Sequence, residues 1–158
     1  MNDSVWLSDS EQHLWRTWLR VNALLQPAIN RELQRDDLSG PDFAVLVCLT
    51  EAPQDRLRVS DLGRQLQWEK SRLSHHLGRM AKRGLVLRSE CPEDARGAFI
   101  AATHQGRAAI EKAAPHHVST VRRLMFDGME VDEAEVVQRF LDRIKARLEA
   151  DPVDPCKG

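Results

Sequence analysis

The sequence predicts a single, mainly α-helical domain that carries one small β-hairpin. Apolar residues recur at spacings of three and four along both ends of the chain, which is the period of an amphipathic helix. Two shorter helical segments meet near residue 68, and two apolar segments flank a polar loop at 91–97. A chain of 158 residues gives such a domain a sizeable core and leaves no room for a second independent one.

The first long helix is predicted over residues 8–35. Ser8 and Glu11 have the S-x-x-E spacing of a capping box, in which each side chain bonds the backbone N–H of the other residue. The apolar stripe behind them consists of Leu14, Trp18, Val21, Leu25 and Ile29. Pro27 removes one backbone hydrogen bond inside this pattern, so we expect a bend there or two shorter helices.

Two helices are expected next. Pro41 follows Ser39-Gly40 and favours the first position of a second helix, which ends near Ala52-Pro53. A third helix of about eight residues is indicated by the helical spacing of Val59, Leu62 and Leu66.

Trp68-Glu69 forms the turn into a fourth helix over Lys70 to Arg83, and Gly84 provides a left-handed position that ends it. The strands of the hairpin are predicted at 85–90 and at 98–102. A lone hairpin is at best marginally stable in water, so this one is expected to pack on the preceding helices as a wing.

The C-terminal part is predicted to be helical again. Thr103 caps a fifth helix that extends past Lys112, and Pro115 is expected to disturb it. Asp132 and Glu135 have capping-box spacing ahead of a sixth helix that runs nearly to Ala150. Its apolar face comprises Val137, Phe140 or Leu141, Ile144 and Leu148. Residues 151–158, with two prolines, are expected to form a flexible tail.

Charge is distributed unevenly along the chain. The formal net charge is only -1, but ten Lys or Arg and five acidic residues lie between Arg56 and Arg96, which leaves a charge of +5 there and -6 elsewhere. Residues 70–89 contain six basic residues and no acidic one. Such a local patch is typical of a surface that binds nucleic-acid phosphates.

The fourth helix is predicted to present its basic face to DNA. Leu73, Leu77 and Met80 form its apolar stripe, and the opposite side is polar. A helix fits the major groove, where Arg bonds guanine bidentately and Ser or His makes adaptable contacts. We expect Ser71, Arg72, Ser74, His75 and His76 near bases, and Lys70, Arg79 and Lys82 near phosphates. The alternative, a solvated amphipathic helix, requires the short preceding helix, the missing acids and the basic hairpin to coincide by chance.

The chain resembles the MarR family of transcriptional regulators from about Ser10 to Leu148. The resemblance is carried by SRLSHHLGRMAKRGLVLR, residues 71–88, and by DARGAFIAATHQG, residues 94–106. It implies that Arg96 enters the minor groove while Asp94 orients it, in keeping with the attraction of a guanidinium to a narrow, negative groove. The alternative is that Asp94 and Arg96 form a plain surface ion pair.

The resemblance also implies a layout for the chain. Residues 1–150 form one domain with a winged helix-turn-helix core at about 41–103, and the helices at about 8–35 and 104–150 join two copies into a homodimer. Two-fold symmetry then predicts a pseudo-palindromic double-stranded operator with half-sites about one helical turn apart. The implied function is sequence-specific DNA binding in transcription regulation, as a repressor that a small aromatic or anionic effector releases.

The effector site is the least determined part of this prediction. Trp15 and Trp18 are weak candidates for it, the alternative being that they lie in the core or the dimer interface. The family's thiol sensors carry a reactive cysteine near the chain start, whereas the first cysteine here is Cys48, so peroxide sensing is not supported. Cys48 lies in an apolar run that favours a buried, inert thiol, and Cys91 begins a polar loop where its reactivity is open.

Several other classes of protein are disfavoured. His75-His76 and His116-His117 lack the i, i+4 spacing of a helical metal site, so no metal is expected. The usual nucleotide-binding, hydrolase and metalloprotease motifs are missing, and neither catalysis nor a cofactor is predicted. No apolar run suits a bilayer and no signal peptide is recognisable, which favours a cytoplasmic protein. A winged-helix interaction or dimerisation module without DNA binding is the remaining alternative.

Overall fold

The computed structural model describes residues 6–91 and 94–150, with the backbone alone for residues 90, 91 and 94–97. The elements in chain order are α1 (Asp9–Gln34), α2 (Gly40–Thr50), the short helix η1 (Pro53–Asp55), β1 (Arg56–Arg58), α3 (Val59–Leu66), α4 (Lys70–Lys82), β2 (Val86–Cys91), β3 (Asp94–Ala102), α5 (His104–Val121), the π-helical turn η2 (Arg122–Phe126) and α6 (Val131–Ala150).

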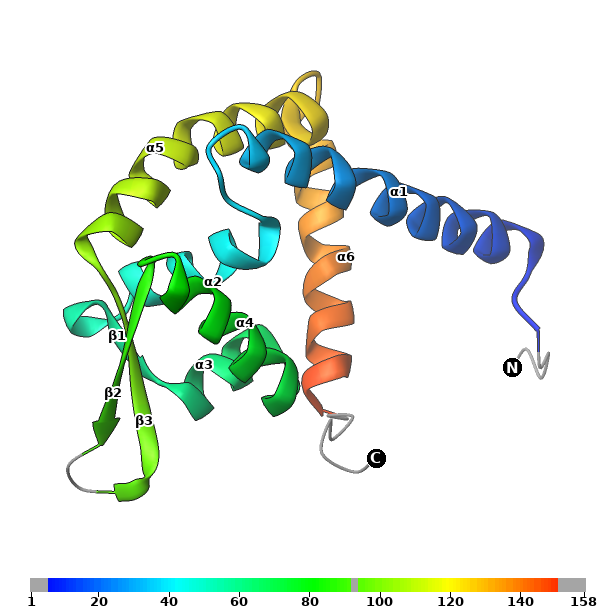
Figure 1. The fold of residues 1–158 in the computed structure, drawn as a ribbon. Coiled ribbons are helices and arrows are strands. Elements are labelled where there is room, and N and C mark those ends of the chain that lie inside the picture. Colours follow the sequence, from blue (N-terminus) through cyan, green and yellow to red (C-terminus); the bar gives the residue numbers. More distant parts are fainter. Residues whose placement is uncertain (1–5, 92–93, 151–158) are drawn as a thin grey trace.

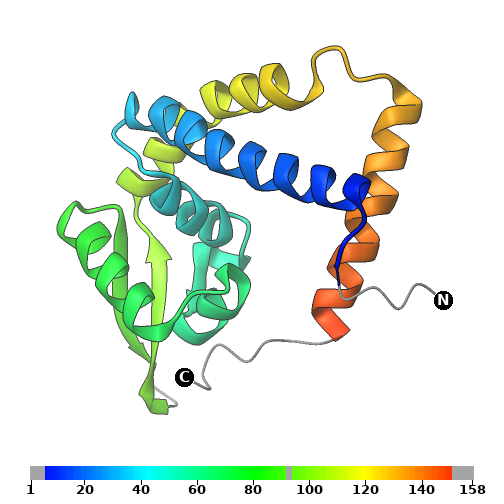
Figure 2. The same ribbon diagram turned by 90° about the vertical axis from the view of Figure 1, so that its right-hand side faces the viewer.

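The elements form a winged lobe and a helical layer. The lobe contains α2, α3, α4 and the sheet, and α5 and the C-terminal half of α1 lie over it (Figure 1). The N-terminal half of α1 extends away from the lobe as an arm, and α6 descends beside the lobe as a second arm (Figures 1 and 2). The predicted mainly α-helical fold with a small β-wing is confirmed.

The core lies inside the winged lobe and continues up to α5. Its fully buried side chains come from the end of α1, the turn that follows it, and α2, α3, α4 and β3: Leu33, Leu38, Val45, Leu46, Leu49, Leu62, Leu73, Met80 and Ile100. Each such aliphatic side chain contributes about 1.5–3 kcal/mol when it leaves water. The core therefore fixes α4 in the lobe through its apolar stripe.

The first helix begins as predicted and continues through Pro27. The N–H of Ser8 donates to the Glu11 carboxylate at 2.8 Å, and Ser8 Oγ accepts from the N–H of Glu11. Pro27 lies inside one helix of 26 residues, so of the two expected outcomes, a bend or two shorter helices, the second is wrong. Pro27 and Ala23, whose carbonyl loses its usual donor, are both exposed, and water can satisfy that carbonyl.

The sheet has three antiparallel strands in the order β1-β3-β2, one more than the sequence predicted. β1 pairs with the inner end of β3, where Leu57 lies opposite Ile100. This strand is three residues long, and Arg56-Leu57-Arg58 offers too few positions to display the alternation of a strand. The hairpin of β2 and β3 is found where it was predicted, although β3 begins at Asp94 rather than Ala98.

The C-terminal helices differ from prediction in two details. Thr103 caps α5 by accepting the Gly106 N–H at 2.9 Å, as expected, but Pro115 does not interrupt the helix. The predicted capping box of Asp132 and Glu135 is wrong, because α6 begins at Val131 and Glu133 accepts the N–H of Glu130 at 2.9 Å. The pairs Glu130/Glu133 and Asp132/Glu135 have the same spacing and overlap in the sequence. The first pair, which is closer to the turn at Gly128, caps the helix. Within residues 6–91 and 94–150, no helix is both long and apolar enough to cross a membrane.

Candidate nucleic-acid interface

One face of α4 is exposed and basic, as predicted. Leu73, Leu77 and Met80 are buried, so the opposite face of the helix turns outward. The exposed residues that were assigned to DNA are Lys70, Ser71, Arg72, Ser74, His75, Arg79 and Lys82. Gly78 lies among them, and a Cβ placed on it would meet nothing within 4 Å. The face is therefore low and open, as insertion into a groove requires.

The turn between α3 and α4 fixes the direction of α4. Gln67 adopts a left-handed conformation with φ of 53° at the end of α3, and the N–H of Trp68 donates to the Gly63 carbonyl at 3.0 Å. Gly63 allows close packing, because a Cβ at this position would lie 3.3 Å from the side chain of Leu73. α4 then ends at Gly84, whose φ of +72° provides the predicted left-handed cap.

The prediction that His76 lies near DNA bases is wrong. Its side chain is buried with the residue 6% exposed, and its Nε2 lies 3.0 Å from Oδ1 of Asp42 on α2. His76 lies three residues after Leu73 and four before Met80, which places it at the margin of the apolar stripe. This spacing indicates a buried position, but the prediction followed the polar character of histidine instead.

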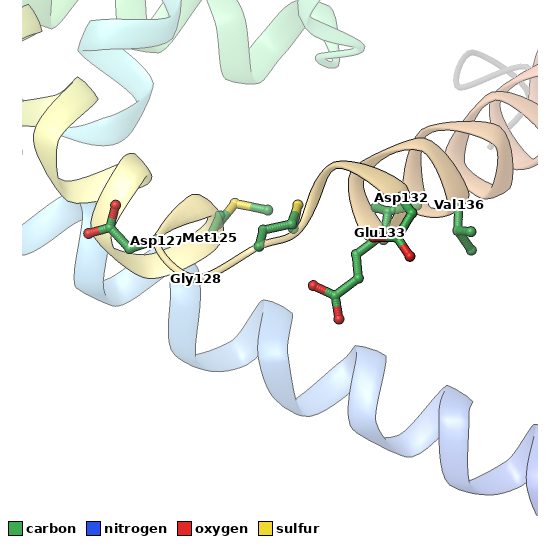
Figure 3. Close-up of a pocket in the computed structure, with 8 residues that line it drawn as sticks. Met125, Asp127, Gly128, Asp132, Glu133 and Val136 are labelled. Atoms are coloured by element: carbon green, nitrogen blue, oxygen red, sulfur yellow. The ribbon is translucent and has the colours of Figure 1, made fainter.

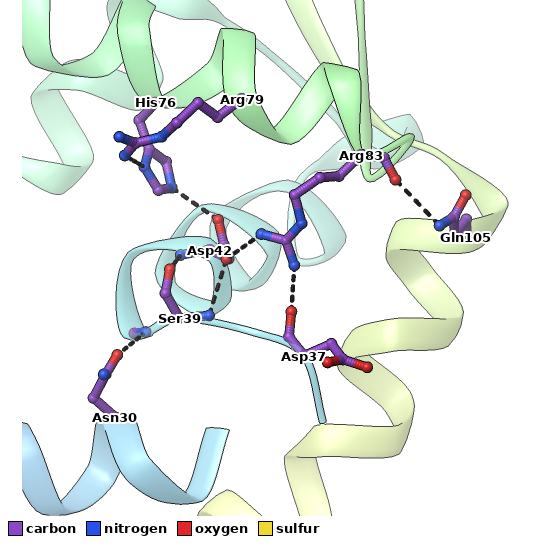
Figure 4. Close-up of polar contacts among 9 residues, drawn as sticks. Asn30, Asp37, Ser39, Asp42, His76, Arg79, Arg83 and Gln105 are labelled. Atoms are coloured by element: carbon purple, nitrogen blue, oxygen red, sulfur yellow. Dashed lines mark hydrogen bonds and ion pairs between the residues drawn. The ribbon is translucent and has the colours of Figure 1, made fainter. Parts of the chain in front are cut away.

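Asp42 is the centre of a polar cluster that joins α2 to α4 (Figure 4). Its Oδ2 accepts the backbone N–H of Ser39 at 2.9 Å and the guanidinium of Arg83 at 2.7 Å. Arg83 also donates to the carbonyl of Asp37, and the amide of Gln105 reaches the Arg83 carbonyl at 3.1 Å. Arg83, the last residue of the predicted fourth helix, is therefore committed to the fold, a role that the sequence analysis missed.

The charges of this cluster follow from burial and hydrogen bonding. Burial raises the pKa of Asp42, but the hydrogen bonds from Ser39 and Arg83 outweigh it and hold that pKa below its usual value. Burial lowers the pKa of His76, and nearby Arg79 and Arg72 act in the same direction, while Asp42 opposes them. Asp42 is thus an anion and His76 a neutral imidazole at neutral pH.

Two arginines of the exposed face contact aromatic side chains beside them. Arg79 bonds His76 Nδ1 at 3.0 Å, and the guanidinium carbon of Arg72 lies 4.5 Å from the centroid of the Trp68 ring. Neither contact was predicted, because each depends on how the turn and α2 pack against α4. They leave Arg72 and Arg79 exposed but held in place.

The wing projects from the lobe at the same end as α3 and α4 (Figure 1). The backbone of Asp94 and Arg96 lies in β3, with Asp94 opposite Cys91, but the side chains of Asp94 and Arg96 lie outside the described part of the chain. Arg56 and Arg58 lie over the ring of Phe99 at 5.1 and 5.5 Å, so two more basic side chains flank the base of the wing. The sequence analysis counted them in the basic window but did not assign them to DNA, because β1 was not predicted.

The weak effector candidates, Trp15 and Trp18, line neither of the two hollows identified among the described residues. Trp15 and Trp18 are both exposed on the α1 arm. A hollow of about 540 Å³ lies instead where η2 leads into α6, between Met125, Gly128, Glu133 and Val136 among others (Figure 3). A second one, of about 430 Å³, lies beside the Asp42 cluster and is lined by His76, Arg79 and Arg83.

His116 and His117 on α5 and Cys48 on α2 take structural positions. His116 pairs with Asp36 at 2.8 Å, and His117 packs on Phe43 with ring centroids 4.5 Å apart. In the described ranges, no three His, Cys, Asp or Glu side chains gather as metal ligands would. Burial raises the pKa of the Cys48 thiol, and Glu51 adds to the effect, in keeping with the inert thiol that was predicted. The side chain of Cys91 and all of Cys156 lie outside the described residues.

Comparison with known proteins identifies relatives of this chain. AbsC, a MarR family transcriptional regulator from Streptomyces coelicolor, matches with a TM-score of 0.88 and 39% identity, over 93% of this chain and 99% of that chain. Sco3205, a MarR family transcriptional regulator from the same organism solved in complex with DNA, matches with a TM-score of 0.84 and 33% identity, over 98% and 95% of the two chains.

A relative from Bacillus subtilis, the HTH-type transcriptional repressor YetL, is 28% identical over 111 residues, which cover 70% of this chain and 66% of YetL. The MarR family itself matches residues 38–97, which contain α2, the helix-turn-helix and most of the hairpin. With its fold, its basic α4 and these similarities, the chain belongs to the MarR family.

Proposed function

We propose that the protein is a homodimeric transcription regulator that binds double-stranded DNA sequence-specifically and is not an enzyme. The observation that carries this proposal is the exposed, acid-free face of α4, which lies at the same end of the lobe as the wing. α4 enters the major groove, and the tip of the hairpin follows the adjacent minor groove. The DNA complex of the related Sco3205 supports this assignment.

The DNA-binding residues divide by the chemistry of their partners. Ser71, Arg72, Ser74 and His75 approach base edges, and His76 is no longer part of this set. Lys70, Arg79 and Lys82 bind phosphates, and Arg96, oriented by Asp94, enters the minor groove. Arg56 and Arg58 at the base of the wing add positive charge near the backbone of the DNA.

The proposed homodimer rests on apolar surface that one copy leaves exposed. None of the residues of α6 is buried, although most of the stability of a helix in a protein comes from packing its amphipathic face. Both arms carry large exposed apolar side chains: Leu14, Trp15, Trp18, Leu19, Val21 and Leu24 on α1, and Val131, Val136, Val137, Leu141 and Leu148 on α6. A second copy that covers both arms removes this surface from water. Trp15 and Trp18 then belong to the dimer interface.

The regulator acts as a cytoplasmic repressor whose DNA binding a small aromatic or anionic effector relieves. The repressor YetL among its relatives supports the direction of control. In the dimer, the two α4 helices can lie at a spacing that fits DNA or at one that does not. An effector acts by binding one of these two states more tightly, since a ligand shifts an equilibrium only through its different affinities for the two states. A screen of aromatic carboxylates by thermal shift, with and without bound DNA, tests this part.

The DNA-binding proposal is tested by selection from a random library of 30-bp duplexes with the purified chain. We expect enrichment of a pseudo-palindrome with half-sites about one helical turn apart. Affinity for the enriched duplex is expected to fall about a hundredfold or more between 50 and 200 mM salt, because several phosphates are neutralised. No enrichment, together with affinity that does not depend on salt, would reject DNA binding in favour of a protein-interaction module.

The wing is tested by Arg96→Ala. We expect weaker binding to the enriched duplex and to its near variants alike, with the dimer intact on gel filtration. Arg35→Ala is the matched control, because Arg35 is an exposed arginine at the end of α1 that pairs with Glu32. Equal affinity of Arg96→Ala and the wild type would refute the minor-groove assignment.

A further inference from the structure

A continuous set of side-chain contacts runs from Asp42 on α2, beneath α4, to the exposed arginines of α4. Asp42 lies 3.0 Å from His76 Nε2, the His76 ring meets the Trp68 ring edge-on at a centroid distance of 5.4 Å, and Trp68 lies under the guanidinium of Arg72. On the other side of the imidazole, Nδ1 bonds Arg79 at 3.0 Å. His76 thus contacts Arg79 directly and Arg72 through the ring of Trp68.

The hydrogen bond with Arg79 determines how the imidazole is protonated. Arginine has only donors, so Nδ1 of His76 is the acceptor and carries no proton. The proton of the neutral ring is therefore on Nε2, which faces the anionic Asp42. Asp42 is itself held by Ser39 and Arg83, so the ring is fixed from the side of α2.

Fixing an arginine before DNA arrives favours binding. A free arginine side chain carries about 2 kcal/mol of rotamer entropy, and part of it is lost when the guanidinium docks on a base or a phosphate. A guanidinium held over an indole ring loses that freedom in advance, while the N–H donors at its edge stay available. The same holds for Arg79, because one of its nitrogens is anchored on His76 while the residue as a whole remains exposed.

We propose that Trp68 and His76 are positioning residues that hold Arg72 and Arg79 in their DNA-binding positions on one edge of α4. This inference rests on the proposed DNA-binding function. Trp68 acts through Arg72, and His76 acts both directly through Arg79 and through the orientation of Trp68. Neither ring touches the DNA.

Double-mutant cycles on the enriched duplex test the proposal. Trp68→Leu is expected to weaken binding about two- to fivefold in the wild-type background, which corresponds to an exposed cation–π contact. In an Arg72→Ala background, the same substitution is expected to have no further effect. In an Arg64→Ala background, which removes an exposed arginine of α3 that pairs with Asp61, its full effect is expected to remain.

Trp68→Phe separates positioning from folding. Trp68 also packs against the core, so Trp68→Leu lowers stability to some degree. Phe keeps an aromatic face and is expected to restore most of the affinity, provided that circular dichroism shows all variants folded at the assay temperature. His76→Leu is expected to lose its effect in an Arg79→Ala, Arg72→Ala background for the same reason.

The outcomes are distinguishable from a failure of the proposed function. Equal losses from Trp68→Leu with and without Arg72, or equal affinities of Trp68→Phe and Trp68→Leu, would overturn the positioning role while DNA binding stands. A wild-type chain that enriches no duplex would overturn both. Loss of affinity confined to the background that contains Arg72 supports the proposal.

Discussion

At the residue scale, the carboxylate of Asp42 makes three contacts that join two helices. It accepts the N–H of Ser39 at the start of α2, it pairs with Arg83 at the end of α4, and it lies against Nε2 of His76. The residue is only 2% exposed, so each of these partners matters more than it would in water. The beginning of α2 and the DNA-reading helix are therefore joined through one buried anion.

Asp42→Ala is expected to lower the free energy of unfolding by about 2–4 kcal/mol. The substitution removes a helix cap and leaves a buried polar partner unsatisfied. Urea denaturation followed by circular dichroism measures the change. Ser39→Ala is the control, because it removes only a cap and is expected to cost about 1 kcal/mol. Equal losses for the two variants would show that the contacts of Asp42 with α4 add nothing.

One buried histidine, His76, and one half-buried histidine, His117, predict a loss of stability in mild acid. Burial lowers the pKa of His76 and of His117 below the ordinary value. Their unfolded forms therefore bind protons at a higher pH than their folded forms do. The stability that they contribute is complete above about pH 6.5 and is lost as pH falls from there through the lowered folded pKa values.

The test is urea denaturation at pH 7.5, 6.5 and 5.5. The wild type is expected to lose stability over this range, and a His76→Gln, His117→Gln variant is expected to have a flatter profile. His75→Gln is the control, because His75 is exposed on the same helix. A double variant as sensitive to acid as the wild type would show that other groups cause the effect. The carboxylates of Asp36 and Asp42 titrate below this window, since hydrogen bonds hold their pKa values low.

At the scale of elements, two glycines show how the helices meet their surroundings. Gly106 lies in the first turn of α5, and a Cβ on it would lie 2.0 Å from the Leu85 carbonyl oxygen. The start of α5 thus packs directly on the backbone that leads into β2. Gly78 lies in the middle of α4, where the surroundings are empty.

Alanine substitutions at these glycines are expected to act in opposite directions. Gly106→Ala forces α5 away from Leu85 and is expected to lower the melting temperature by more than 10 °C or to prevent folding. Gly78→Ala is expected to raise stability by up to about 1 kcal/mol, because alanine favours the helix. It is also expected to weaken DNA binding, since the added methyl group stands on the groove-facing surface. Thermal melts and anisotropy titrations measure both, and a stable Gly106→Ala protein would refute the packing of α5 on Leu85.

At the scale of the whole molecule, charge and apolar surface are separated. The basic segment lies in the lobe, at α4 and the wing, and the large exposed apolar side chains gather on the two arms. Binding DNA through α4 and the wing and a second copy through the two arms are therefore compatible. The dimer interface then sets the distance between the α4 helices of the two copies.

Val136→Glu on α6 is expected to convert the dimer to a monomer at micromolar concentration. Val136 is 57% exposed in one copy, and a buried carboxylate in the proposed interface would lack a partner. Sedimentation velocity measures the mass, and the melting temperature is expected to fall and to lose its dependence on concentration. Leu87→Glu on β2 is the matched control, because Leu87 is 64% exposed but lies outside both arms. An unchanged dimer in Val136→Glu would move the interface away from α6.

The sequence by itself determined the features that depend on neighbours within three or four positions. The caps at Ser8 and Thr103, the left-handed end at Gly84, and the apolar stripe of α4 all have short-range signals and were predicted correctly. The basic face of α4 and the hairpin followed from the same local patterns. Periodicity and capping act through the helix itself, so they can be read before the fold is known.

Only the tertiary structure decided which side chains of the basic segment are free. His76 and Arg83 lie in the same polar run as Arg72 and Lys82, yet both are committed to Asp42, 41 positions away from Arg83 in the chain. The three-residue strand β1 likewise exists through its pairing with β3. A buried polar group is tolerated only where a distant partner satisfies it, and no local pattern encodes that partner.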